Sequence, residues 1–402
     1  MFVEAFTHIL EIGEYLCKKG CDCVKRIIYI LIICIMAGFF TPCFAEDLAE
    51  GANCGILMET STGQVLFEKN PDQQVSIASI TKIMTMLIIM ERIEAGALAF
   101  DDLVTVSENA MSYGGSTMFL EAGEQLSVHD MLKGIAVASA NDGCVAMAEH
   151  IAGTEGKFVE MMNQRAAQLG MTNTCFKNSN GLDEEGHFSS ARDVAIMSCE
   201  LLKHPKITEY TTIWMDSLRD GKFQLANTNK LIRFYQGATG LKTGSTSQAG
   251  CCLSASAQRD GMSLVAVVLG AVDTKTRFSV ARALLDYGFS GFCVKNYVEK
   301  GSPLGMVAVS KGREKQVAVE ASESFSELRE KTNTKEAEQG ISLPDRISAP
   351  VKKGDKVGEL TFTVDGKTVK TVDIVASEDV GKKSIFMMLV DLVQSWITGK
   401  TA

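Results

Sequence analysis

The chain has 402 residues, 46% of them hydrophobic and 22% charged, which is the composition of a folded globular protein rather than a disordered one. Its formal net charge is −9 and no run of five Lys or Arg residues occurs, which argues against nucleic acid as a partner. We therefore expect the partner to be a small molecule, or a neutral to anionic polymer that the protein approaches locally.

The first 45 residues have the pattern of a secretory signal. Lys25 and Arg26 precede an apolar run, 27–40, that is short for a bilayer span, and small residues just before Glu46 suit a signal peptidase. We predict a cleaved signal peptide over residues 1–45, with an uncleaved membrane anchor as the alternative. In either case the rest of the protein is expected to be exported.

The cysteines do not form a recognisable framework. Five of the twelve lie in the predicted signal: Cys17, Cys21, Cys23, Cys34 and Cys43. The odd number that remains, mostly inside apolar runs such as 251–253, indicates buried small hydrophobic residues rather than disulfides. No Cys/His spacing suggests a zinc site, so no metal is expected.

The next part of the chain reads as strands, then helices, then strands. We predict a hairpin at 54–59 and 64–69, helices at 81–95, 131–151, 157–169 and 191–203, strands at 240–244, 249–257 and 262–270, and a helix at 277–286. Strands at both ends with helices between them predict an α+β domain in which the first and last strands meet in one sheet backed by helices.

Beyond about residue 293 the pattern changes to short β-like runs, such as 316–320 and 359–364, separated by charged turns. This change predicts a small all-β domain over residues 293–378.

The last segment, 379–402, is predicted to be an amphipathic helix. Its apolar face would carry Ile385, Met388, Leu389, Leu392 and Trp396. The segment is too short and too polar to span a bilayer, but it suits a position in the membrane interface. A helix packed on its own domain is the alternative.

A lysine stands in the middle of the apolar helix that begins near residue 81. Ser79 and Lys82 are three residues apart, so on a helix their side chains share a face. Desolvation lowers the pKa of a lysine, and a free amine beside a serine hydroxyl is a general base beside a nucleophile. Taken alone, Ser-x-x-Lys is a weak signal that chance can supply.

Two further polar groups stand in apolar surroundings. Ser139 and Asn141 interrupt a helical pattern, where they could also be an N-cap and a satisfied core amide. Lys242, Thr243 and Gly244 lie on a predicted strand, where a glycine often marks close approach of a ligand and where the lysine could equally be a solvated edge residue.

Together the three motifs stand in the order and at the spacing of the penicillin-recognising serine enzymes. Within that superfamily the chain resembles the D-alanyl-D-alanine carboxypeptidases of the low-molecular-weight penicillin-binding proteins. The resemblance continues through LANTNKL (225–231), GATGLKTGST (237–246), NSNGLDEEGHFSSARDVA (178–195) and APVKKGDKVG (349–358). It implies a β-lactamase/transpeptidase-like domain over residues 46–292, an antiparallel sheet with helices on both faces.

The resemblance also implies roles for individual residues. Ser79 would attack the carbonyl between two D-alanines and form an acyl-enzyme, Lys82 would take its proton, and Ser139 would relay a proton to the departing amine. The implied substrate-binding residues are Asn141, Lys242, Thr243, Gly244, Ser245 and Arg277.

Within that set, Thr243 and Arg277 would meet the terminal carboxylate, although Arg277 could also be an ordinary surface arginine. Backbone N–H groups of Ser79 and Ser245 would form the oxyanion hole. His187 is expected to be structural.

The expected function is therefore a serine-type D-Ala-D-Ala carboxypeptidase at the outer face of the cell membrane. It would act on peptidoglycan stem peptides, bind β-lactams covalently and need no metal or organic cofactor. One rival is a serine β-lactamase, but no Glu-x-x-Leu-Asn motif lies between Asn141 and Lys242, and Glu184 and Glu185 stand in another context. The other rival is a non-catalytic penicillin-binding sensor, against which the intact polar residues weigh.

Overall fold

The computed structural model describes residues 48–333, 335–387 and 390. The predicted signal peptide and most of the predicted C-terminal helix lie outside these residues. Among the helices that are described, none combines the length and the apolar character needed to cross a membrane.

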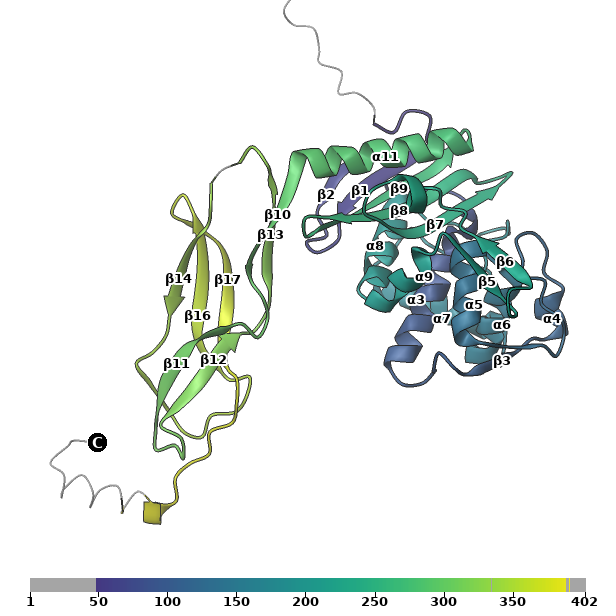
Figure 1. The fold of residues 1–402 in the computed structure, drawn as a ribbon. Coiled ribbons are helices and arrows are strands. Elements are labelled where there is room, and N and C mark those ends of the chain that lie inside the picture. The colour runs from purple at the N-terminus through teal and green to yellow at the C-terminus, as the bar shows by residue number, and fades with distance from the viewer. Residues whose placement is uncertain (1–47, 334, 388–389, 391–402) are drawn as a thin grey trace, which may run out of the picture. The chain divides into compact units, whose positions relative to one another are not determined.

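A five-stranded antiparallel sheet is the centre of the first domain (Figure 1). Its strands, in the order β2-β1-β9-β8-β7, are β1 (Cys54–Glu59), β2 (Val65–Lys69), β7 (Ala238–Thr246), β8 (Gly250–Arg259) and β9 (Met262–Ala271). β1 pairs with β9 from Cys54 opposite Leu269 to Glu59 opposite Leu264. The predicted meeting of the first and last strands is therefore present.

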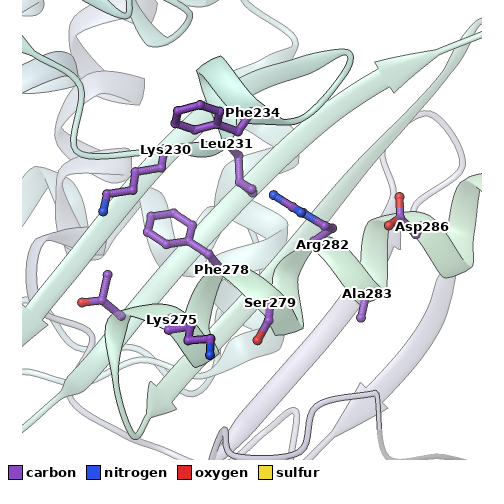
Figure 2. A pocket seen from close by; sticks show the side chains of 10 residues that line it. Lys230, Leu231, Phe234, Lys275, Phe278, Ser279, Arg282, Ala283 and Asp286 are labelled. Carbon is purple, nitrogen blue, oxygen red and sulfur yellow. The ribbon is translucent and has the colours of Figure 1, made fainter.

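Helices cover both faces of this sheet. On one face, α3 (Lys82–Glu94) and α8 (Ala191–Leu202) contact the sheet, and α5 (Val128–Lys133), α6 (Asn141–Ala152) and α7 (Glu155–Gln168) belong to the same core. The other face packs against α10 (Leu231–Phe234) and α11 (Thr274–Gly291). Alternate residues of β1 point to opposite faces, so Ile56 joins the first core and Leu57 the second. On the second face, α10 and α11 border a cavity (Figure 2).

Short elements complete this domain. They are η1 (Ala78–Thr81), β3 (Leu103–Thr105), α4 (Glu108–Met111), β4 (Gln125–Ser127), η2 (Gly134–Ala138), η3 (Pro205–Ile207), α9 (Thr208–Thr211), β5 (Met215–Leu218) and β6 (Phe223–Ala226).

The prediction of one helix over residues 131–151 is wrong. α5 leads into the π-helical segment η2, Ser139 adopts a left-handed conformation with φ of 65°, and α6 begins only at Asn141. The backbone N–H of Asn141 bonds to the Ser116 carbonyl at 2.7 Å, a contact that continuous helix would forbid. Both halves are apolar, so periodicity alone does not reveal the break.

In the described part of residues 292–376 every secondary-structure element is a strand, in line with the predicted all-β domain. The strands are β10 (Phe292–Val298), β11 (Pro303–Ser310), β12 (Gln316–Ala321), β13 (Phe325–Glu330), β14 (Glu338–Ser342), β15 (Arg346–Ser348), β16 (Lys356–Val364) and β17 (Lys367–Ala376). A six-stranded sheet, β14-β16-β17-β12-β11-β15, packs around its own core, which includes Val317, Phe362 and Ile374. The exact domain boundaries stay predictions.

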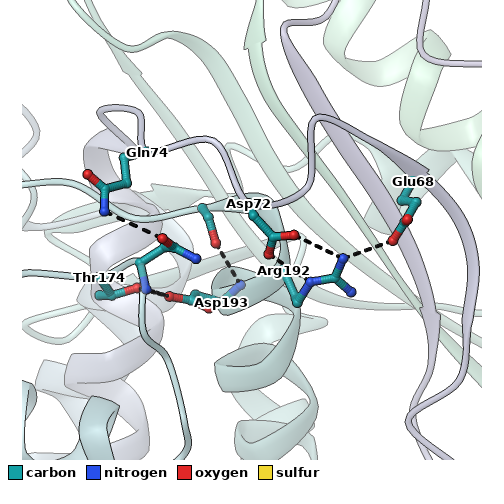
Figure 3. A network of polar contacts seen from close by, with 8 residues as sticks. Glu68, Asp72, Gln74, Thr174, Arg192 and Asp193 are labelled. Atoms are coloured by element: carbon teal, nitrogen blue, oxygen red, sulfur yellow. Dashed lines mark hydrogen bonds and ion pairs between the residues drawn. The ribbon is translucent and has the colours of Figure 1, made fainter.

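A polar network fixes the start of α8 against the β1–β2 hairpin (Figure 3). The Arg192 guanidinium contacts Glu68 at 2.9 Å and Asp72 at 2.8 Å. Next to it, the Asp193 carboxylate accepts hydrogen bonds from the backbone N–H of Asn173 at 2.8 Å and the hydroxyl of Thr174 at 2.7 Å. These contacts hold the loop that leads toward residues 178–187 beside the sheet.

Candidate active site

The side chains of Ser79 and Lys82 meet where η1 passes into α3. Ser79 lies in the 3-10 turn and Lys82 is the first residue of the α-helix. The Lys82 Nζ donates a hydrogen bond to the Ser79 Oγ at 2.9 Å. Lys82 is fully buried, whereas Ser79 is partly exposed. The predicted pair is therefore in direct contact, with the hydroxyl accessible from solvent and the amine shielded from it.

Three acceptors surround the Lys82 Nζ. In addition to the Ser79 Oγ, it contacts the Asn141 Oδ1 at 2.7 Å and the Asn180 carbonyl oxygen at 2.6 Å. Burial lowers the pKa of Lys82 to about 8, while nearby Cys144 and Asp142 partly oppose the shift. Lys82 is therefore mostly protonated at pH 7, but its uncharged fraction is far larger than that of an ordinary lysine.

The neutral form of Lys82 also fits these contacts. A neutral amine has two N–H donors and one lone pair. The Asn141 and Asn180 oxygens can hold the two N–H groups, which leaves the lone pair for the proton of the Ser79 hydroxyl. A proton can pass between Ser79 and Lys82 without movement of heavy atoms, which is the requirement for a general base beside a nucleophile.

The break between η2 and α6 carries Ser139 and brings Asn141 into contact with the Lys82 amine. Ser139 is 5% exposed and Asn141 is buried. Both ends of the Asn141 amide are engaged, because the Oδ1 accepts from Lys82 and the Nδ2 donates to the Gly114 carbonyl at 2.7 Å. Its role in holding a substrate amide stays a prediction.

β7 brings Lys242, Thr243 and Gly244 to the same place. A Cβ on Gly244 would lie 2.9 Å from the Ile77 carbonyl oxygen and 3.0 Å from the Ser79 backbone nitrogen, so glycine allows the strand to pack directly on η1. The Lys242 Nζ is buried and donates to the Thr243 carbonyl at 2.9 Å. Burial lowers the pKa of Lys242 well below its ordinary value, and the charge of nearby Lys82 adds to the shift.

Two more predicted residues, Ser245 on β7 and Arg277 on α11, lie at the end of β7. Ser245 is an exposed residue of the strand, next to Gly244. Arg277, in the first turn of α11, is 7% exposed, which rules out the alternative of an ordinary surface arginine. Its Nη1 donates to the carbonyl oxygens of Gly244 at 3.1 Å and Cys252 at 3.2 Å. Arg277 therefore reaches the sheet behind Thr243, and its contact with a substrate carboxylate stays a prediction.

Sequence reasoning did not single out Thr228. Its hydroxyl accepts a hydrogen bond from the Thr243 hydroxyl at 2.7 Å. The adjacent Asn229 donates to the Gly240 carbonyl at 2.8 Å and so fastens this segment to β7. The segment 225–231 contributed only to the family resemblance, which predicted no role for its individual residues.

Sequence reasoning also missed Glu155, at the start of α7. Its Oε1 accepts from the Ser179 backbone N–H at 2.9 Å and the Ser179 hydroxyl at 2.6 Å, and its Oε2 accepts from the Tyr113 hydroxyl at 2.6 Å. Ser179 precedes Asn180, whose carbonyl holds Lys82, and Tyr113 precedes Gly114, whose carbonyl holds Asn141. One carboxylate thus fixes both loops that orient the polar cluster.

His187 has a structural position, as expected. Its ring bonds to the Thr81 hydroxyl through the Nε2 at 2.8 Å, and its Nδ1 accepts from the Lys177 backbone N–H at 3.2 Å. Burial lowers the pKa of His187 to about 4, so the ring is neutral at physiological pH. Within the described residues, no cluster of three His, Cys, Asp or Glu side chains is placed to hold a metal ion.

Two family descriptions match consecutive parts of the chain. The one described as D-alanyl-D-alanine carboxypeptidase matches residues 44–273, and the one described as penicillin-binding protein 5, C-terminal domain, matches residues 292–382. The D-alanyl-D-alanine carboxypeptidase DacF of Bacillus subtilis (strain 168) is 43% identical over 385 residues, which cover 93% of this chain and 99% of that protein.

Solved structures show the same similarity. Penicillin binding protein 5 from Haemophilus influenzae matches with a TM-score of 0.69 and 33% identity, over 83% of this chain and 98% of that one. Penicillin-binding protein D2 from Listeria monocytogenes, in its ampicillin-bound form, matches with a TM-score of 0.53 and 30% identity, over 60% of this chain and 98% of that one. The predicted fold class, a transpeptidase-like domain followed by an all-β domain, is confirmed.

We expect the Lys82 amine to titrate near pH 8, so that it is mostly protonated below that pH and mostly a free amine above it. The physical cause is burial, which disfavours the charged form. NMR titration of lysine-labelled protein, with the signal assigned from a Lys82→Arg variant, would measure it. A pKa close to the value of about 10.4 for a free lysine would contradict the interpretation of Lys82 as a base.

Glu155→Ala should slow covalent labelling by a fluorescent penicillin by about ten- to a hundredfold, because small displacements of positioning groups are costly. The change removes the three hydrogen bonds that fix the carbonyls next to Lys82 and Asn141.

Glu149→Ala is the matched control for Glu155→Ala. Glu149 also accepts hydrogen bonds, from Ser107 at 2.5 Å and Asn109 at 2.8 Å, but neither partner contacts the lysine cluster. The control should label at the wild-type rate. Equal slowing of labelling in both variants would show a general loss of stability instead of a local role for Glu155.

Proposed function

This chain belongs to the D-alanyl-D-alanine carboxypeptidase family, and we propose on that premise that it removes the terminal D-alanine from peptidoglycan stem peptides as a serine-type enzyme. The observation that carries the proposal is the contact of 2.9 Å between the Lys82 Nζ and the Ser79 Oγ. Burial keeps the pKa of that amine at about 8, which suits a base that works near neutral pH.

Acylation begins when the Ser79 hydroxyl gives its proton to Lys82 and the oxygen attacks the carbonyl carbon between the two D-alanines. A carbon–oxygen bond forms, and the carbonyl oxygen gains negative charge that the backbone N–H groups of Ser79 and Ser245 stabilise. The carbon–nitrogen bond then breaks, the carbonyl re-forms, and Ser139 relays the proton held by Lys82 to the amine of the departing D-alanine, which returns Lys82 to its free-amine form. Water hydrolyses the resulting ester and restores the Ser79 hydroxyl.

The substrate would bind along the strand β7, beside residues of α6 and α11. The terminal carboxylate of the substrate would meet the Thr243 hydroxyl, with the Arg277 guanidinium behind the strand as the source of positive charge. Burial favours the neutral form of Lys242, which would act as a polar group beside the substrate. Gly244 lets β7 lie directly against η1, which brings the strand beside the Ser79 nucleophile. Asn141 would hold the substrate amide once it exchanges one of its present partners.

The two rival functions are not favoured. The chain aligns with 99% of the length of DacF of Bacillus subtilis, which is named a D-alanyl-D-alanine carboxypeptidase. This similarity weighs against a β-lactamase. The intact contact between Ser79 and Lys82 weighs against a non-catalytic sensor. Covalent reaction with β-lactams is part of the proposal, supported by the similarity to a relative solved in an ampicillin-bound form.

We also propose that the protein is exported and lies at the outer face of the membrane, attached through its C-terminal segment. The signal-like pattern of residues 1–45 supports export. Ile385 and Phe386, at the start of that C-terminal segment, are 78% and 77% exposed, and such apolar side chains suit contact with a membrane interface.

Ser79→Ala should abolish both covalent labelling by fluorescent penicillin and release of D-alanine from a diacyl-D-Ala-D-Ala peptide, because among the described residues Ser79 supplies the only hydroxyl that contacts the Lys82 amine. Ser76→Ala, a nearby serine outside the motif, is the matched control and should label normally. Labelling that persists in Ser79→Ala would mean that the nucleophile is wrongly assigned. Rapid release of hydrolysed penicillin by the wild type would instead indicate a β-lactamase.

A chain expressed from residue 46 and ending at Ser377 should stay in the supernatant when mixed with phospholipid vesicles, whereas the chain from residue 46 to its end should sediment with them. The physical reason is the loss of the apolar face that would enter the interface. A full-length Ile385→Ser, Phe386→Ser variant should sediment less than the wild type. If the truncated chain still sediments, the C-terminal segment is not the anchor.

A further inference from the structure

The cavity between α10 and α11 is distinct from the Ser79–Lys82 site (Figure 2). Its volume is about 730 Å³, large enough for several residues or sugar units of a polymer. The floor is apolar and is formed by Leu231, Phe234 and Phe278. Phe234 is 61% exposed, so its ring is accessible to a ligand in the cavity.

Three cations border this apolar floor: Lys230, Lys275 and Arg282 (Figure 2). All three are exposed, and none forms a salt bridge with a carboxylate among the described residues. Many other cations of the same domain are paired with acids, as Arg165 is with Glu91 at 2.7 Å. The cavity therefore concentrates unpaired positive charge on a chain whose net charge is −9.

The single acid of the cavity, Asp286, does not cancel this charge. Its carboxylate accepts a hydrogen bond from the Tyr235 hydroxyl at 2.7 Å and lies 3.9 Å from the Arg259 guanidinium. Asp286 is thus engaged at one end of the cavity by groups of its own. The remaining cations are complementary to an anionic ligand.

Both walls of the cavity are fastened to β7. On one side, Asn229, directly before Lys230, donates to the Gly240 carbonyl at 2.8 Å. On the other side, Arg277, directly before Phe278, donates to the Gly244 carbonyl at 3.1 Å. The cavity is therefore held against the edge strand that carries the proposed substrate-binding residues, on the face of the sheet opposite to η1 and α3. A polymer that extends past this edge would meet the charged groups of the cavity.

We propose that this cavity is a second binding site for the same cell-wall polymer, one that takes carboxylate-bearing peptidoglycan outside the dipeptide that is cleaved. The cations would pair with stem-peptide carboxylates, and the aromatic floor would contact the methyl and acetyl groups beside them. The inference rests on the proposed function for the identity of the polymer. It predicts that the cavity contributes to binding of the polymer and not to cleavage of a short soluble peptide.

The test is co-sedimentation with purified peptidoglycan that has been stripped of covalently attached phosphate polymers. A Lys230→Ala, Lys275→Ala, Arg282→Ala variant should bind it with a Kd raised by about tenfold, and the binding of the wild type should weaken as salt is added. Release of D-alanine from a soluble diacyl-D-Ala-D-Ala peptide should stay within about twofold of wild type, since none of the three residues belongs to the Ser79 cluster.

The matched control removes the same charge elsewhere on the domain. A Lys157→Ala, Lys206→Ala, Lys222→Ala variant loses three exposed cations outside the cavity and should sediment like the wild type. Equal weakening in both triple variants would overturn the proposal in favour of non-specific charge, as would unchanged sedimentation of the cavity variant. Failure of the wild type to bind, or preference of the cavity for anionic phospholipid vesicles over peptidoglycan, would overturn it as well.

The two proposals fail in different ways. If even the wild type releases no D-alanine from the soluble peptide, the proposed function fails, while sedimentation still reports on the cavity. If D-alanine is released but the cavity variant sediments normally, only the second site is wrong.

Discussion

The catalytic use of the hydrogen bond between Lys82 and Ser79 depends on the burial of the Lys82 amine, which is shielded from water. Burial of an ammonium ion costs several kcal/mol unless other groups compensate it. Here the contacts compensate the cost of burial only in part. The Asn141 amide oxygen and the Asn180 carbonyl oxygen hold the nitrogen in place, but neither carries a full negative charge. The amine is thus fixed in position while burial still lowers its pKa to about 8.

That arrangement requires close packing around the turn that carries Ser79. A Cβ on Gly181 would lie 2.0 Å from the Ala78 carbonyl oxygen, and Gly181 has a φ of +86° that favours glycine. Gly244 approaches the same turn from β7. Two segments that are far apart in the chain therefore pack closely against η1. A side chain at Gly181 or Gly244 would force its segment away from the turn that carries Ser79.

Much of the fold was predictable because it rests on local periodicity. The spacing of Ser79 and Lys82, the hairpin at the start of the domain and the last two strands of the sheet all follow from patterns of polar and apolar residues. The break at Ser139 was not predictable in this way, because apolar residues lie on both sides of it. At the break the backbone N–H of Asn141 bonds to the Ser116 carbonyl instead of to a helical partner. The local sequence does not indicate such a long-range contact.

A lysine in an apolar helix three residues after a serine suggested a base beside a nucleophile from the sequence alone. The family followed from the order and spacing of the three motifs together. The partners of that base came from the folded chain alone. Asn180 contributes a backbone carbonyl, which any residue could supply, and Glu155 acts on the site through two loops. Backbone acceptors and long-range hydrogen bonds leave no pattern in a sequence, since they depend on which segments packing brings together.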